Sequence, residues 1–168
     1  LPFLLFHSFN GPHSPICPSL PWANYYHHDQ LNLPLNNSYN IDENIPNIYN
    51  LRSKSGKLTK EWHRQILAYY YAMVTQIDYN IGLIIEELKS LKLFDNTIII
   101  FTSDHGEMMG EHGIWTKGKL GYDATIKVPL IIKTPNMKVY GKQYEDLIGS
   151  IDILPTLLSL SHIPIPSN

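Results

Sequence analysis

The most informative stretch of this chain is Asn96-Thr-Ile-Ile-Ile-Phe-Thr-Ser-Asp-His-Gly-Glu-Met-Met-Gly-Glu-His-Gly-Ile-Trp-Thr-Lys117. Residues 97–102 form a run of β-branched and aromatic residues that ends in a polar turn, which predicts a buried strand. In open α/β sheets, ligands gather at the carboxyl ends of the strands. Asp104 and His105 come directly after the predicted strand. We therefore expect a functional site at this position.

The residue types that follow the strand suit a site for a metal and an anion. Asp104 offers carboxylate oxygens and His105 an imidazole nitrogen, both common ligands of divalent cations. A turn-capping aspartate beside a surface histidine would give the same pattern, so these two residues alone do not define a metal site. Lys117 adds a positive charge to the same loop, which three glycines keep close and adaptable: Gly106, Gly110 and Gly113. A metal and an ammonium together suit an oxyanion such as sulfate or phosphate.

A family resemblance covers this region. The segment from Thr102 to Gly118, together with Tyr122-Asp123 and Lys127-Val-Pro-Leu-Ile-Ile132, resembles the second half of a sulfatase catalytic domain in the alkaline-phosphatase superfamily. It is similar in particular to choline-sulfatases and iduronate-sulfatases, which share the Asp-His pair and a Trp-x-Lys segment. The resemblance extends over nearly the whole chain and implies an alkaline-phosphatase-like fold.

The resemblance also implies roles for individual residues. Asp104 and His105 are expected to bind the metal, and Lys117 is expected to hold the sulfate. Calcium is the metal that the resemblance implies, whereas the histidine ligand leaves manganese or zinc open. His112, in the same loop, is a weaker candidate that more simply orders the loop or lines the rim of the pocket.

A second candidate segment lies near the start of the chain. Residues 2–9 read as a buried strand, and a turn at Asn10-Gly11-Pro12 is followed by His13. Taken alone, a histidine in a proline-rich loop is more often a surface residue than a catalytic one. In sulfatases, however, a Phe-x-x-Pro-His-x-Pro segment after a strand carries a histidine that contacts the sulfate or the leaving oxygen. The resemblance therefore implies that His13 binds sulfate and protonates the leaving oxygen.

Cys17 is the only cysteine, and it is not expected to be the nucleophile. The sulfatase signature Cys-x-Pro-Ser-Arg places a cysteine that is oxidised to formylglycine. Here proline follows Cys17 immediately, and leucine stands at position 20. We therefore expect residues 1–168 to be the C-terminal portion of a sulfatase catalytic domain. The nucleophile-bearing N-terminal half, with its arginine and a further pair of metal-binding aspartates, would lie outside them.

Composition excludes some function classes. A hydrophobic content of 43% and a charged content of 17% fit a soluble globular protein, and 168 residues are enough for one core. The formal net charge of −2 gives no electrostatic footprint for nucleic acid. No apolar run is long enough to predict a membrane span. One cysteine excludes an internal disulfide and leaves the localisation undetermined.

The remaining patterns predict alternating helices and strands. A long irregular excursion from Ser19 to Gly56 precedes a predicted helix over 59–91. Further on we predict a helix over 121–127, a strand over 128–133, an edge strand over 144–151 and a helix over 153–161 capped by Asp152. This alternation indicates an α/β fold with a mixed, mostly parallel sheet flanked by helices, here as a partial domain. The helix over 59–91 should present one apolar stripe: Leu67, Tyr70, Val74, Ile77, Ile81, Ile84, Leu88 and Leu91.

The resemblance implies a metal-dependent sulfuric ester hydrolase. It would cleave a sulfate monoester of a small molecule or a glycan, using a formylglycine nucleophile located outside these residues. Two alternatives remain open. One is a phosphonate or phosphate ester hydrolase of the same superfamily, and the other is a non-catalytic remnant. The 168 residues alone are expected to be inactive.

Overall fold

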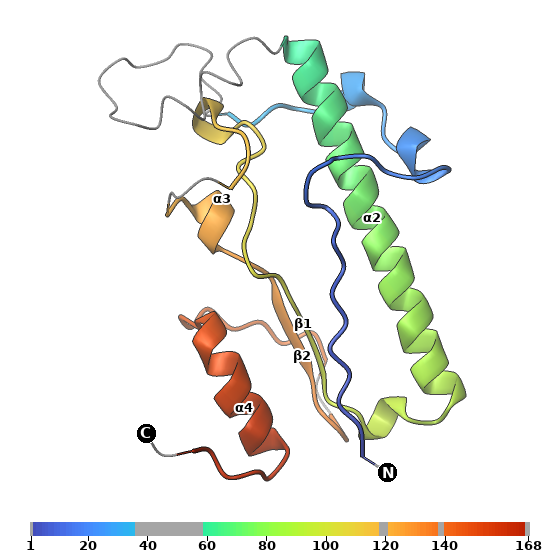
Figure 1. Cartoon of the computed structure of the whole chain (residues 1–168), viewed down its shortest axis with the longest axis vertical. Helices are drawn as coiled ribbons and strands as arrows, with labels where there is room; N and C mark the ends of the chain where they lie inside the picture. The colour runs from blue at the N-terminus through green and yellow to red at the C-terminus, as the bar shows by residue number, and fades with distance from the viewer. Residues whose placement is uncertain (1, 36–58, 118–120, 138–139, 167–168) are drawn as a thin grey trace. The chain divides into compact units, whose positions relative to one another are not determined.

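The computed structural model describes residues 2–35, 59–117, 121–137 and 140–166 (Figure 1). The chain divides into two compact units, one made of Leu1–Glu87 with His105–Lys127 and the other of Leu88–Asp104 with Val128–Asn168. Among the described residues, no helix has both the length and the apolar character that a membrane crossing requires. The main elements are α2 (Lys60–Ser90), β1 (Ile99–Thr102), α3 (Asp123–Ile126), β2 (Leu130–Lys133) and α4 (Ile153–Leu160).

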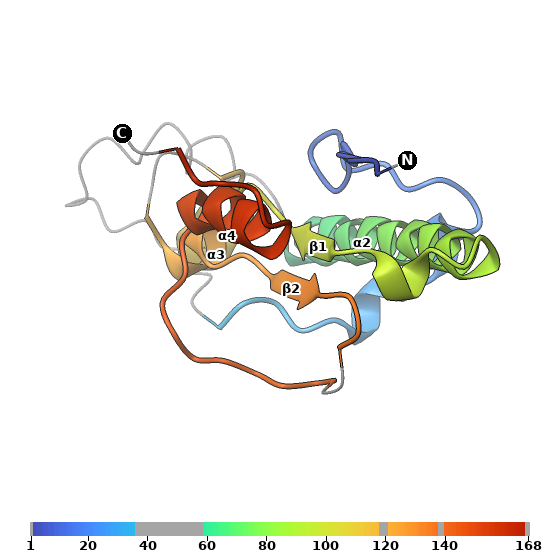
Figure 2. The same ribbon diagram turned by 90° about the horizontal axis from the view of Figure 1, so that it is seen from below.

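The first unit is built on α2, which runs as one unbroken helix (Figure 1, Figure 2). Its bounds confirm the predicted helix over 59–91 to within one residue at each end. The side-chain oxygen of Thr59 accepts a hydrogen bond from the backbone N–H of Trp62 at 3.2 Å, which satisfies one of the open donors at the helix start. The predicted stripe is buried at Leu67, whereas Val74 is 44% exposed. The fully buried residues of α2 lie in its first half: His63, Leu67, Ala68 and Ala72.

Residues 11–31 pack along α2. The hydroxyl of Tyr26 shares a hydrogen bond with Thr75 Oγ1 at 2.8 Å, and Arg64 Nε donates to the carbonyl of Leu31 at 3.1 Å. This part of the predicted excursion is irregular, as expected, with two short 3-10 turns, η1 (Trp22–Asn24) and η2 (His28–Gln30). The rest of the excursion, from residue 36 onward, lies outside the described residues.

The predicted strand over 2–9 is wrong. The segment forms no strand, and the large apolar side chains of residues 3–6 are exposed, with Leu4 at 81% and Phe6 at 89%. A strand requires a neighbour to pair with its backbone N–H and C=O groups. No other described segment pairs with residues 2–9, so the apolar pattern has no ladder to complete.

The second unit contains the strand pair β1 and β2. Both predicted strands are confirmed in shorter form, and they pair antiparallel, with Ile99 opposite Lys133 and Thr102 opposite Leu130. In the described residues they form a two-stranded sheet, so the predicted parallel arrangement is not seen there. The predicted burial of β1 is also incomplete, because Phe101 and Thr102 are exposed. At the other end of the pair, Lys133 Nζ donates to the carbonyls of Thr97, at 3.1 Å, and Phe94, which closes the turn that leads into β1.

The predicted edge strand over 144–151 is wrong, because a local turn forms in its place. The backbone N–H of Gly149 donates to Asp152 Oδ2 at 2.8 Å, and the N–H of Asp152 donates back to the Gly149 carbonyl at 3.0 Å. These bonds wind η5 (Ser150–Asp152) directly into α4. Asp152 therefore stands at the start of the helix, as predicted, but its carboxylate binds the residue three positions earlier.

Candidate active site

The loop after β1 is held against the segment that includes α3 by a close backbone contact and a ring stack. The N–H of Gly106 donates to the carbonyl of Thr125, in α3, at 2.8 Å, and a Cβ at position 106 would overlap the carbonyl oxygen of Ala124. Only glycine allows this approach. Further along the loop, the ring of His112 stacks on Tyr122 with centroids 4.4 Å apart, which fits a role in ordering the loop. Both contacts tie the loop to the segment that includes α3.

His105 and Lys117 meet at the two ends of this loop. The Nδ1 of His105 donates to the carbonyl of Gly106 at 2.8 Å, and Lys117 Nζ lies 2.7 Å from His105 Nε2. Because a carbonyl and an ammonium can only accept and donate, respectively, this network assigns the proton to Nδ1 and the lone pair to Nε2. A histidine that binds a cation uses the same arrangement, with its other ring nitrogen bonded to a carbonyl. The folded chain therefore brings together His105 and Lys117, the residues that the sequence analysis assigned to the metal and to the sulfate.

Glu107 was not predicted as a site residue, and its carboxyl group interacts electrostatically with two of the predicted histidines, His105 and His13. Its Oε1 accepts the backbone N–H of Met108 at 3.0 Å. Burial raises the pKa of Glu107 above its usual value, while the two following backbone N–H groups and the side chains of His105 and His13 act to lower it. The pKa of Tyr70 on α2 is raised mainly by the burial of Tyr70, and the Glu107 carboxylate raises it further. His13 and His105, far apart in sequence, thus act on one carboxyl group.

His13 lies on an exposed turn that is anchored against α2. Its Nδ1 donates to the carbonyl of Ser14 at 2.8 Å. Two residues earlier, Gly11 lies so close to α2 that a Cβ there would come within 3.2 Å of the Met73 methyl group and 3.4 Å of Ile77. The absence of a side chain at position 11 therefore brings the His13 turn onto the helix.

Asp104 follows β1, as predicted, and its side chain is exposed. It belongs to the second compact unit, and the peptide bond to His105 joins it to the first. That bond keeps the two Cα atoms about 3.8 Å apart. Within the described part of the chain, no three side chains of histidine, cysteine, aspartate or glutamate come together as a metal-holding group.

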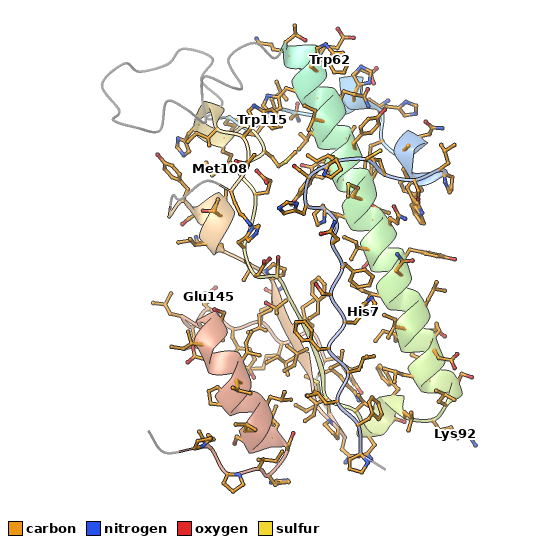
Figure 3. All side chains as sticks on the ribbon, viewed as in Figure 1. His7, Trp62, Lys92, Met108, Trp115 and Glu145 are labelled. Atoms are coloured by element: carbon orange, nitrogen blue, oxygen red, sulfur yellow. The ribbon has the colours of Figure 1, made fainter. Side chains whose placement is uncertain are left out.

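A buried histidine on α2 was missed by the sequence analysis. His63 is only 2% exposed, and its Nε2 donates to the carbonyl of Met109 at 2.9 Å. Its ring meets Trp115 edge to face, with centroids 4.5 Å apart, and Figure 3 shows Trp115 on the side of the loop that faces the first turns of α2. A signal was available, because His63 lies four residues before Leu67 and so continues the apolar stripe by one helical turn.

The burial of His63 predicts how the stability of this unit changes with pH. Burial lowers its pKa below 6.5, against the effect of the hydrogen bond to Met109. The unfolded chain therefore binds a proton more readily, so the stabilisation is complete above about pH 6.5 and is lost as the pH falls toward the folded pKa. We expect the melting temperature of the full-length protein to fall more between pH 7 and pH 5.5 in the wild type than in His63→Gln. Superimposable pH profiles would show that His63 is not buried in its neutral form. Glu107 is common to both proteins, so its own titration cancels in the comparison.

Comparison with known proteins identifies the family. A model of the sulfatase family matches residues 1–163. The arylsulfatase of Clostridium perfringens is 34% identical over 171 residues, which cover 99% of this chain and 35% of the relative. The chain belongs to the sulfatase family. It spans about a third of the length of the relatives it matches.

Solved structures agree with this assignment. A phosphonate monoester hydrolase from Silicibacter pomeroyi superposes with a TM-score of 0.78 at 30% identity, covering 92% of this chain and 33% of the other. An enzyme in complex with its substrate D-glucosamine-2-N,6-O-disulfate gives a TM-score of 0.60 at 32% identity, covering 69% of this chain and 24% of that enzyme. The sulfatase segment therefore has the fold of the alkaline-phosphatase-like enzymes.

Sulfatases generally use a divalent metal, and the residues of this segment fit part of such a site. Asp104 and His105 are consecutive and offer an oxygen and a nitrogen donor, and the bond from His105 Nδ1 to Gly106 leaves the lone pair on Nε2. Divalent sites use about four to eight donors. These two donors would supply only part of a coordination shell, and Lys117 would have to move off Nε2 for a cation to bind there.

Proposed function

We propose that the protein to which this segment belongs hydrolyses sulfate monoesters. The observation that carries the proposal is the meeting of Lys117 and His105, at 2.7 Å, on the loop after β1 of a sulfatase-family chain. A fixed ammonium beside a metal ligand is suited to an oxyanion whose charge moves during the reaction. The arylsulfatase relative supports sulfate as that oxyanion.

Each candidate residue takes one role in this proposal. Asp104 and His105 hold a divalent cation, which polarises the sulfate oxygens when it is bound. Calcium is the ion we propose, with manganese or zinc as the alternatives that an imidazole ligand permits. Lys117 binds a sulfate oxygen through its ammonium. His13, on the turn that follows residues 2–9, binds the sulfate and transfers a proton to the leaving oxygen.

The remaining parts of the catalytic domain are proposed to lie outside residues 1–168. Cys17 is exposed and does not match the formylglycine signature, and the chain covers about a third of its arylsulfatase relative. We place the formylglycine nucleophile and the remaining metal ligands on that other part, which makes this segment the C-terminal portion of the catalytic domain. In the complete domain, the pair β1 and β2 would join a mixed, mostly parallel sheet flanked by helices.

The substrate is proposed to be a sulfate ester carried by a glycan. The support is the relative solved with D-glucosamine-2-N,6-O-disulfate, a sulfated sugar, which aligns with 69% of this chain. The phosphonate monoester hydrolase from Silicibacter pomeroyi supports a second candidate, a phosphonate ester hydrolase. Both reactions transfer a tetrahedral oxyanion, so the Lys117 and His105 arrangement serves either one.

The test is to compare kcat/KM of the full-length protein for an aryl sulfate and for the matched aryl phosphonate monoester. We expect the sulfate to be preferred by at least about 100-fold, or about 2.7 kcal/mol of transition-state stabilisation. A preference for the phosphonate would replace the first proposal by the second. Turnover of neither substrate, with metal bound, would favour a protein that binds oxyanions without catalysis. Sulfated and unsulfated glucosamine derivatives, compared as inhibitors, test the glycan assignment separately.

A further inference from the structure

We propose that His63 is a positioning residue for the proposed reaction: it fixes the loop 105–117 to α2 and thereby holds Lys117 and His105 in register. The inference rests on the proposed function of that loop. The side-chain contacts of His63 described above join it to the part of the loop between His105 and Lys117.

Three consecutive contacts attach the His63 ring to the loop. Its Nε2 donates to the Met109 carbonyl at 2.9 Å in a buried environment. A Cβ at position 110 would overlap the ring, so Gly110, with a positive φ of 92°, lets the loop backbone lie directly on the imidazole. The ring also packs edge to face on Trp115, with the two ring centroids 4.5 Å apart. One side chain therefore contacts the loop at both sides of its tightest turn.

The turn at residues 110–114 is rigid, so it couples the His63 contact to the backbone position of Lys117. Gly110 donates its N–H to the Ile114 carbonyl at 2.9 Å, and the N–H of Ile114 donates to the Glu111 carbonyl at 2.9 Å. Ile114 is fully buried, so the turn cannot shift without opening the core. Since Trp115 lies two residues before Lys117, a displacement at the His63 contact moves the backbone that carries the ammonium. A shift of about 1 Å at a reacting group is enough to cost about 100-fold in rate.

A plain packing role for His63 would give different results from a positioning role. Packing depends on the volume of the ring, whereas positioning depends on a nitrogen donor that reaches the Met109 carbonyl. Glutamine can place an N–H close to the position of Nε2. Asparagine carries the same amide on a shorter side chain, which cannot reach that carbonyl, and leucine removes the donor while keeping an apolar side chain. His63→Gln and His63→Asn are equally polar, but only glutamine can reach the Met109 carbonyl. Comparing the two variants therefore shows whether the hydrogen bond to that carbonyl matters, apart from the polarity of the side chain.

The experiment uses the full-length protein and measures kcat, KM for an aryl sulfate, and hydrogen exchange of the peptide that covers residues 105–117. We expect His63→Leu and His63→Asn to lose about 100-fold in kcat/KM, mainly in kcat, with faster exchange in this peptide. His63→Gln should stay within about fivefold of the wild type in both measurements. Tyr26→Phe is the matched control, because it removes one hydrogen bond between α2 and a different segment, and it should leave the exchange of residues 105–117 unchanged.

The two levels of the proposal fail in different ways. If the wild type does not turn over the aryl sulfate, the proposed function fails, while hydrogen exchange still tests the attachment by His63. The inference is overturned if His63→Asn exchanges and reacts like the wild type, or if His63→Gln is as impaired as His63→Asn. If His63→Leu does not fold, the glutamine and asparagine pair carries the test, because both keep a polar side chain of moderate size.

Discussion

Replacing Lys117 by alanine in the full-length protein should lower kcat/KM for an aryl sulfate by about 1,000-fold, or about 4 kcal/mol. Lys117 is exposed, and its ammonium lies 2.7 Å from His105 Nε2, so it is close enough to the proposed metal ligand to contact the same sulfate group. A positive charge at this point stabilises the negative charge that moves in the transition state more than the ground state. The loss should therefore appear mainly in kcat, with the metal content unchanged.

The matched control for Lys117 is Lys127→Ala. Lys127 lies ten residues further along, is also exposed, and forms a surface ion pair with Asp123 at 2.7 Å, an interaction that contributes little to stability. It should keep kcat/KM within about twofold of the wild type. Wild-type turnover in Lys117→Ala would place the sulfate-binding charge elsewhere. A parallel loss in both variants would indicate a general effect of surface charge.

Replacing Asp104 by alanine should remove metal and activity together. In the proposed site, Asp104 provides one of the two metal donors of this segment, and the neighbouring His105 provides the other. Changes to groups outside the first coordination shell already cost about 10-fold to 100-fold in metal affinity, so loss of a direct ligand should cost more than about 100-fold. Metal content after dialysis and kcat/KM at saturating metal are the two measurements.

Asp123→Ala is the control for Asp104, because Asp123 is an exposed aspartate at the start of α3 whose side chain pairs with Lys127, the residue after that helix. It should retain full metal content and nearly full activity. Full metal occupancy in Asp104→Ala would contradict the assignment of this carboxylate as a ligand. Partial rescue of activity by excess metal would support it, since mass action offsets a weakened site.

The parts of the fold that could be predicted are those with a local cause. The 31-residue helix α2 follows from its own apolar period and its cap at Thr59, so the prediction was right to within one residue at each end. The strands β1 and β2 follow from short β-branched runs between turn residues. The strand predicted over 2–9 has an equally apolar pattern, but a strand also needs a partner, and a local pattern carries no information about one.

The candidate site was predictable for a similar reason. Asp104 and His105 are joined by a peptide bond, and Lys117 closes a loop whose glycines signalled close contacts, which the structure confirms at Gly106 and Gly110. The two missed residues have long-range causes. The pKa of Glu107 is raised mainly by burial in the fold, and one of the groups acting on it, His13, lies more than ninety residues earlier. His63 binds a loop more than forty residues later. The apolar period of α2 could have indicated that His63 is buried, but it carries no information about the loop that His63 contacts.

The continuity of α2 has a consequence for how the protein tolerates changes in length. The helix attaches the Lys117 loop at His63 and the His13 turn at Met73, ten residues further along. At about 1.5 Å and 100° per residue, the helix sets both the distance between the two attachments, about 15 Å along its axis, and the angle between them. One residue inserted between these points would rotate one attachment around the axis by about 100°. Seven inserted residues would nearly restore the angle but increase the distance by about 10 Å, so neither insertion could keep both attachments in place.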